Sequence, residues 1–159
     1  MNQREQRFLV DKMLGRLAKW LRVFGYDTEY SPDKFGSGLL LESLRENRML
    51  LTRGKKLSDK RGWQVVYLKS DFIGEQLKQL ASELHLKYSF DKIFSRCTLC
   101  NGKILLVSEK TQLKELVPEY VYKTQNQFYR CEKCSQIYWK GTHFDLIKND
   151  LAKLGFEIR

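Results

Sequence analysis

The sequence predicts an α/β domain over residues 1–90, followed by a small second domain over residues 91–159. In the first part, short apolar runs typical of buried strands alternate with segments at helical spacing, which favours a parallel sheet flanked by helices. In the second part, two cysteine pairs and short strand-like segments replace that alternation. The composition is globular, with 42% hydrophobic and 30% charged residues in a chain of 159.

Local patterns define the elements of the first domain. Residues 7–10 form an apolar run that ends at Asp11, and Gly25 is suited to terminate the helix that follows. The turn residues Pro32 and Gly36 precede a second helical segment. The expected strands span 7–10, 28–30, 48–52 and 64–68, and the expected helices span 12–24, 39–47 and 72–86.

The four cysteines form two pairs with metal-ligand spacing. Cys97 and Cys100 make one CxxC, Cys131 and Cys134 make another, and 30 residues separate the pairs. Two such knuckles present four thiolates to one ion, which is the zinc-ribbon arrangement, and a site filled by four thiolates is structural. The alternative of two disulfides is disfavoured because no secretion signal opens the chain. We therefore expect a structural Zn²⁺ and a cytoplasmic protein.

Three further segments complete the second domain. The first knuckle (residues 96–102) and the second knuckle (residues 130–136) are followed by strand-like segments over 104–107 and 137–139. A terminal helix over 142–154 is expected to pack back on one of the two domains. Aromatic residues concentrate here and could stack on bases or could cover a thin ribbon core, two alternatives that the sequence leaves open. They are Phe128, Tyr129, Tyr138 and Trp139.

The chain carries a large excess of positive charge. Lys and Arg total 29 against 19 Asp and Glu, a formal net charge of +10. A surplus of this size favours a polyanionic partner, most commonly nucleic acid. No apolar run is long enough to cross a bilayer, so we expect no membrane partner.

Two basic clusters are candidates for phosphate contacts. The helix expected over 12–24 places four cations within a sector of about 120°. A second cluster surrounds the end of the strand expected over 48–52. Because the carboxyl ends of parallel strands meet at one edge of a sheet, where ligands bind, Asp11 and Arg53 are expected to share a rim. A solvated face without a specific partner is the alternative for either cluster. The helix cations are Lys12, Arg16, Lys19 and Arg22, and the second cluster comprises Arg45, Arg48, Arg53, Lys55, Lys56, Lys60 and Arg61.

Four segments resemble one known family. Residues 8–27, FLVDKMLGRLAKWLRVFGYD, are similar to the opening of the Mut-seven C-terminal RNase domain, and residues 48–53, RMLLTR, to its second signature. Residues 94–102, FSRCTLCNG, are similar to its first knuckle, and FYRCEKC with YWKGTH, between residues 128 and 143, to its second. The resemblance implies a PIN-like nuclease domain followed by a zinc ribbon. It also implies a ribonuclease in which carboxylates at strand ends hold Mg²⁺ or Mn²⁺.

The sequence departs from this family at two acidic positions. Asp11 is present, but the family's Thr-Arg-Asp after the third strand is Thr52-Arg53-Gly54 here, and residues 35–38 lack the family's Asp before the second helix. A degenerate metal site is therefore expected, because hard cations need several oxygen ligands. Asp71 follows a strand end and could reach the rim. Other candidate replacements are Asp33, Glu42 and Asp59.

Three functions follow from these features. The leading hypothesis is an RNA-binding protein of ribonuclease ancestry, acting on ribosomal or other structured RNA, with Asp11 as a remnant ligand. The second is an active endoribonuclease in which Asp11 and Asp71, with Asp33 or Glu42, rebuild a Mg²⁺ or Mn²⁺ site. The third is a protein-interaction module in which the ribbon binds a partner and the charge is incidental. Under the first hypothesis the phosphate contacts are Lys12, Arg16, Lys19, Arg22, Arg53, Lys55 and Lys56.

Overall fold

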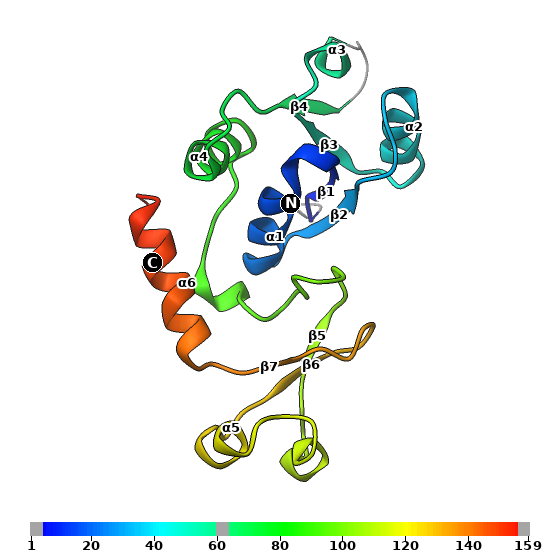
Figure 1. Cartoon of the computed structure of the whole chain (residues 1–159). Helices are drawn as coiled ribbons and strands as arrows, with labels where there is room; N and C mark the ends of the chain where they lie inside the picture. The colour runs from blue at the N-terminus through cyan, green and yellow to red at the C-terminus, as the bar shows by residue number, and fades with distance from the viewer. Residues whose placement is uncertain (1–4, 60–63, 156–159) are drawn as a thin grey trace.

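Four parallel strands form the larger of two sheets (Figure 1). The computed structural model describes residues 5–59 and 64–155, so Lys60 and Arg61 of the second basic cluster lie outside the described residues. The strand order is β2-β1-β3-β4, with β1 and β3 inside, which confirms the expected α/β class and parallel sheet. The strands are β1 Arg7–Asp11, β2 Asp27–Ser31, β3 Met49–Thr52 and β4 Val65–Tyr67.

Helices cover both faces of this sheet. Successive side chains of a strand point to opposite faces, and the inner strand β1 is buried on both of them. Phe8 and Val10 join the cluster that contains the apolar sides of α1 and α4, whereas Leu9 joins Leu39 and Leu40 of α2. The helices are α1 Gly15–Val23, α2 Ser37–Arg45, the short α3 Lys55–Ser58 and α4 Ile73–Leu84.

The ends of the first two helices show how local sequence sets their bounds. The segment expected as a helix from Lys12 begins as a 3-10 turn, Lys12–Leu14, capped by the Asp11 carboxylate, which accepts from the Met13 N–H. Gly25 ends this segment with a φ of 86°, as predicted, and a Cβ there would lie 2.6 Å from Ser95 Oγ. Helix α2 stops two residues earlier than expected, and Asn47 follows it with a φ of 52°.

The second sheet is antiparallel and carries both knuckles. Its order is β5-β6-β7, and its strands are Ile104–Leu106, Tyr129–Cys131 and Ile137–Tyr138. The outer two strands were expected, whereas β6 was not. A 3-10 turn, Lys110–Leu113, and helix α5, Glu119–Thr124, fill the chain between β5 and β6. Leu113 and Val117 of this insertion bury Phe128, so Phe128 serves the ribbon core.

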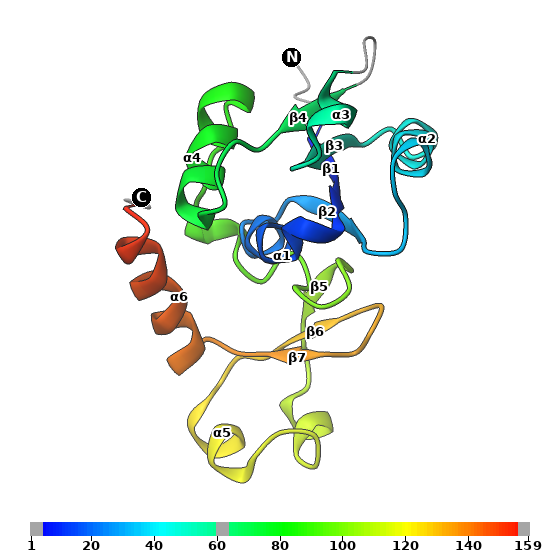
Figure 2. The same cartoon turned by 45° about the horizontal axis from the view of Figure 1, so that its top comes forward.

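Helix α6, Thr142–Lys153, packs back on the larger sheet's helices, as expected of the terminal helix. Leu151 is buried in the same cluster as the apolar sides of α1 and α4. A Cβ on Gly74, in α4, would lie 3.4 Å from Leu154, just after α6. Figures 1 and 2 both show α6 running from the end of β7 toward α4. Within residues 5–59 and 64–155, no helix has the length and apolarity needed to cross a membrane.

The first knuckle docks on the outer edge of the larger sheet, strand β2. Asn101, the residue after the second cysteine, has a φ of 66° and is 95% buried. Its Oδ1 accepts from the Thr28 N–H at 2.9 Å, and its Nδ2 donates to Asp27 at 2.7 Å and Glu29 at 3.0 Å. The side chain thus binds backbone and side chains of an edge strand, the part of a sheet whose unpaired groups most need a partner.

Two buried arginines strengthen this junction. Arg22, only 7% exposed, donates from Nε to the Thr28 carbonyl and from Nη1 to the Thr98 carbonyl of the first knuckle, at 2.8 and 3.0 Å. Arg48 donates to Asp27 at 2.7 Å. Burial alone would raise the pKa of Asp27, but hydrogen bonds from Arg48 and Asn101 lower it to about 2. Arg22 and Arg48 therefore bond groups of the protein itself, although Arg22, one of the expected phosphate contacts, also lines a cavity beside Arg16 and Lys19.

Replacing Asn101 by Ala should lower the free energy of unfolding of the metal-loaded protein by about 1–3 kcal/mol, because the Thr28 N–H would stay buried without an acceptor. Chemical denaturation measures the change. Ser135→Ala is the matched control: Ser135 has the same φ of 66° and the same position in the second knuckle, but is exposed. We expect that control to shift stability by less than about 0.5 kcal/mol; equal losses in both variants would contradict the docking role.

Candidate metal centre and nucleic-acid interface

The four cysteine sulfurs gather at one point of the part that holds the smaller sheet. All four lie within 4.8 Å of one another, with Cys97 Sγ 3.6 Å from Cys134 Sγ and Cys100 Sγ 3.4 Å from Cys131 Sγ. A tetrahedral ion with Zn–S bonds near 2.3 Å requires sulfur–sulfur distances of about 3.8 Å. The residues therefore fit a tetrahedral metal ion such as zinc.

Hydrogen-bond donors lie beside three of the four sulfurs, although burial raises the pKa of Cys100 to about 12. The backbone N–H groups of Gly102 and Lys133 point at Cys100 Sγ and Cys131 Sγ, each at 3.4 Å. A Cβ on Gly102 would lie 2.8 Å from Cys131 Sγ, so only glycine fits there. The Tyr138 hydroxyl lies 3.0 Å from Cys97 Sγ. Burial raises the pKa of Cys97, but donors led by this hydroxyl outweigh it and lower the pKa to about 7.

The carboxyl edge of the larger sheet, the rim, holds Asp11 in a closed set of hydrogen bonds. Asp11 ends β1 and is 6% exposed. One of its oxygens accepts from Met13 N–H at 2.9 Å. The other accepts from the Thr52 hydroxyl at 2.5 Å and from the Arg53 N–H at 3.2 Å. Asp11 and Arg53 thus share the rim, as expected from parallel strands.

Asp71 reaches the rim through Arg53 instead of joining Asp11. The Arg53 guanidinium donates to the Leu68 carbonyl at 2.7 Å and pairs with Asp71 at 2.6 Å. The Asp71 side chain is 81% exposed. Glu42 bonds the Ser31 hydroxyl and Lys34. In the part of the chain that is described, the cysteine quartet is the only group of three or more Cys, His, Asp or Glu close enough to hold a metal.

A basic groove runs between α1 and the first knuckle. Its volume is about 410 Å³, and Arg16 and Lys19 of α1 line it opposite Thr98 and Leu99 of the knuckle. Both cations are exposed and form no hydrogen bond or ion pair with residues 5–59 or 64–155. We call this feature the α1–knuckle groove. Its cations are free to meet anions from solution.

The other expected phosphate contacts differ in availability. Lys12 is exposed and lies 4.5 Å above the Phe35 ring. Lys55 and Lys56 are exposed on α3, at the rim. The guanidinium of Arg53 is used by Leu68 and Asp71, and that of Arg22 by backbone carbonyls. Five of the seven expected cations therefore face solvent and two do not; those facing solvent are Lys12, Arg16, Lys19, Lys55 and Lys56.

Two residues that matter here were not assigned these roles from sequence. Asn101 joins the first knuckle to β2, and Tyr138 contacts the sulfur of Cys97, a member of the cysteine quartet. An Asn after a CxxC pair signals a positive φ, because Asn tolerates that region better than most residues. The sequence around Asn101 does not indicate which strand its side chain binds, because that strand lies 73 residues earlier in the chain.

If the four cysteines hold a metal, its removal with a strong chelator should expose the edge of the larger sheet, because the knuckle that carries Asn101 would lose its shape. Hydrogen exchange read by NMR gives a matched pair of amides. The Thr28 amide, which donates to Asn101, should lose most of its protection. The Leu50 amide of the inner strand β3, which donates to the Gln64 carbonyl, should lose much less. Equal behaviour of both amides would show that the metal does not support the junction.

Comparison with known proteins agrees with the resemblance seen in the motifs. The family model described as the Mut7-C RNAse domain matches residues 6–151, nearly the whole chain. The searches of curated proteins and of solved structures found no match. The matched span contains the rim, the α1–knuckle groove and all four cysteines. The chain belongs to the Mut7-C RNAse domain family.

Proposed function

We propose that this protein binds RNA by its phosphates in the α1–knuckle groove, and that a zinc ion keeps the knuckle side of the groove in shape. One observation carries the proposal: Arg16 and Lys19 line a groove in a chain of an RNase-domain family and have no protein partner among the described residues. Cations held beside a groove are the usual phosphate contacts of nucleic-acid-binding proteins.

The charge distribution supports a path that extends beyond the groove. Lys12, in the 3-10 turn before α1, follows Asp11 directly, so cations continue from the rim along α1 to the groove. Lys55 and Lys56 add two exposed cations at the rim. Phosphate contacts of this kind fix position and carry no sequence information. Structured RNA, of which ribosomal RNA is one kind, is therefore the target class that we favour.

The rim supports binding without hydrolysis. A PIN-like enzyme, the class to which we assign the larger sheet, needs clustered carboxylates to hold Mg²⁺ or Mn²⁺. Asp11 has both oxygens in hydrogen bonds, and Asp71 pairs with the Arg53 guanidinium. Gly54 stands where the family has an acid. We therefore propose a degenerate catalytic site, with endoribonuclease activity as the alternative that family membership favours.

The cysteine site supports zinc and a reducing compartment. Four free cysteines in tetrahedral spacing are the ligand set of structural zinc. Thiolate ligands persist where disulfides do not form, which supports the cytoplasm as the place of action. The smaller sheet is then a zinc ribbon fused to the PIN-like part.

Reversing both groove charges, with Arg16→Glu and Lys19→Glu together, should weaken RNA binding by at least about tenfold. The dependence of log K on log salt should become shallower by about 1.4 for single-stranded RNA, because two phosphate contacts are lost. Fluorescence anisotropy of labelled RNA with zinc-loaded protein at several KCl concentrations measures both quantities. Lys114→Glu with Lys123→Glu, exposed positions of the ribbon insertion, is the charge-matched control and should cost much less.

The same labelled RNA, incubated with zinc-loaded protein and added Mn²⁺, should stay intact on a gel. Cleavage that disappears in an Asp11→Asn variant would establish the endoribonuclease instead.

In the binding experiment, equal losses of affinity in the groove variant and in its control would show that RNA does not contact the groove. Binding to a protein partner that is insensitive to salt, without RNA affinity, would favour the interaction module.

A further inference from the structure

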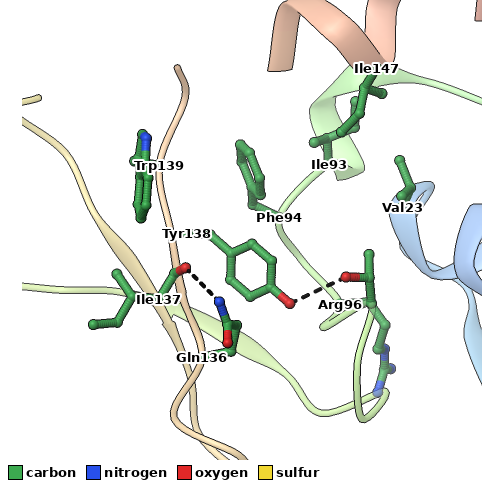
Figure 3. Close-up of a pocket in the computed structure, with 10 residues that line it drawn as sticks. Val23, Ile93, Phe94, Arg96, Gln136, Ile137, Tyr138, Trp139 and Ile147 are labelled. Carbon is green, nitrogen blue, oxygen red and sulfur yellow. Dashed lines mark hydrogen bonds between the residues drawn. The ribbon is translucent and has the colours of Figure 1, made fainter. Parts of the chain in front are cut away.

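A second cavity lies beside the first knuckle. Its volume is about 280 Å³, and it lies between the end of α1, strand β7 and helix α6 (Figure 3). Thr98 lines both the α1–knuckle groove and this second cavity. The two spaces are therefore neighbours separated by a single knuckle residue. We call the second one the aromatic cavity.

The walls of the aromatic cavity suit a flat, unsaturated ring. Phe94, Tyr138 and Trp139 supply three aromatic side chains. The rings of Phe94 and Tyr138 lie with centroids 5.9 Å apart and tilted, side by side in Figure 3. Val23, Ile93 and Ile147 complete the lining with aliphatic side chains. A planar group entering this space meets aromatic and aliphatic surface together.

Polar groups stand among these apolar walls. Arg96, Thr98 and Gln136 belong to the lining. Arg96 donates from Nη1 to the Asn101 carbonyl at 3.1 Å, which leaves most of its five N–H donors for other acceptors. Gln136 is exposed and carries an amide that both donates and accepts. The Thr98 hydroxyl already bonds the Tyr138 hydroxyl, and the Gln136 amide donates to the Ile137 carbonyl, each at 3.4 Å. The donors and acceptors that remain on Arg96 and Gln136 are the ones that the edge of a nucleobase would meet.

The backbone of Phe94 is strained in a way that this site would explain. Its φ is 66°, a region that bulky residues rarely occupy and that costs of order 1–3 kcal/mol. Asn101 and Ser135 have the same φ, but they follow CxxC pairs and are short polar residues. Phe94 lies three residues before Cys97, outside both CxxC turns. Its conformation places the ring on Tyr129, at 5.6 Å between centroids, and on Tyr138, so the strained residue forms part of the cavity wall.

We propose that the aromatic cavity takes one unpaired base of a single-stranded or looped RNA segment whose phosphates lie in the α1–knuckle groove. This inference rests on the proposed function, because the groove supplies the strand from which the base turns inward. Base–aromatic stacking tolerates any base, since every base has a π-face. The cavity then gives the protein a preference for unpaired over paired RNA, which phosphate contacts alone do not provide.

The test compares two probes of equal length: a single-stranded RNA and an abasic ribose-phosphate strand. Zinc-loaded wild-type protein should bind the RNA more tightly than the abasic strand in fluorescence anisotropy. Phe94→Leu should weaken RNA binding by roughly 5- to 150-fold, the range of one stacked base, and leave abasic binding unchanged. Tyr120→Leu removes an aromatic ring that is 77% exposed on α5 and serves as the control, with no expected effect on either probe.

A second measurement stands independently of the folding of the Phe94 variant. Trp20→Phe with Trp63→Phe leaves Trp139 as the only tryptophan of three. Its fluorescence should be quenched by the RNA probe and not by the abasic strand, because only a base can stack in the cavity. Equal affinity for the two probes, or the absence of quenching by bound RNA, would overturn the base site while leaving the phosphate groove in place. Failure of both probes to bind would overturn the groove and the base site together.

Discussion

The structure depends on the docking of one cysteine knuckle against the outer edge of a parallel sheet. Asn101 bonds the Thr28 N–H, Arg22 spans from the Thr28 carbonyl to the Thr98 carbonyl, and Asp27 and Glu29 receive the Asn101 amide. An unpaired edge is a site of aggregation in many proteins, and here a side chain of the knuckle binds it. Because the knuckle carries two of the four clustered sulfurs, a metal held by them would support the edge of the sheet as well.

The same docking creates the surface that we assign to RNA. The α1–knuckle groove exists because the first knuckle lies beside α1, and Thr98 separates it from the aromatic cavity. Two arginines along this interface have different roles. Arg22 donates to backbone carbonyls, whereas Arg16, six residues earlier, has no partner among the described residues. At the rim, Asp11 is held by hydrogen bonds and Asp71 pairs with Arg53, so these two carboxylates do not form a cluster.

Local sequence patterns predicted those features that nearby residues determine. The parallel strands, the stop at Gly25, the cysteine quartet and the shared rim of Asp11 and Arg53 all follow from spacing, glycine conformation and strand direction. The inward turn of Arg22 could not be predicted, because its acceptor Thr98 lies 76 residues away and helical geometry alone placed it with the exposed cations. Strand β6 was not predicted because it is only three residues long and forms by pairing with β5 on one side and β7 on the other. The aromatic cavity likewise needs α1, β7 and α6 at once.

The central claim is that the groove and the aromatic cavity form one binding site joined by the first knuckle. The most direct measurement is the change of backbone amide chemical shifts when zinc-loaded protein is titrated with a short single-stranded RNA. We expect the amides of Arg16 and Lys19 and those of Phe94 to Thr98 to move together, with the same midpoint. Shifts confined to the ribbon insertion around α5, with α1 and the first knuckle unchanged, would contradict the account.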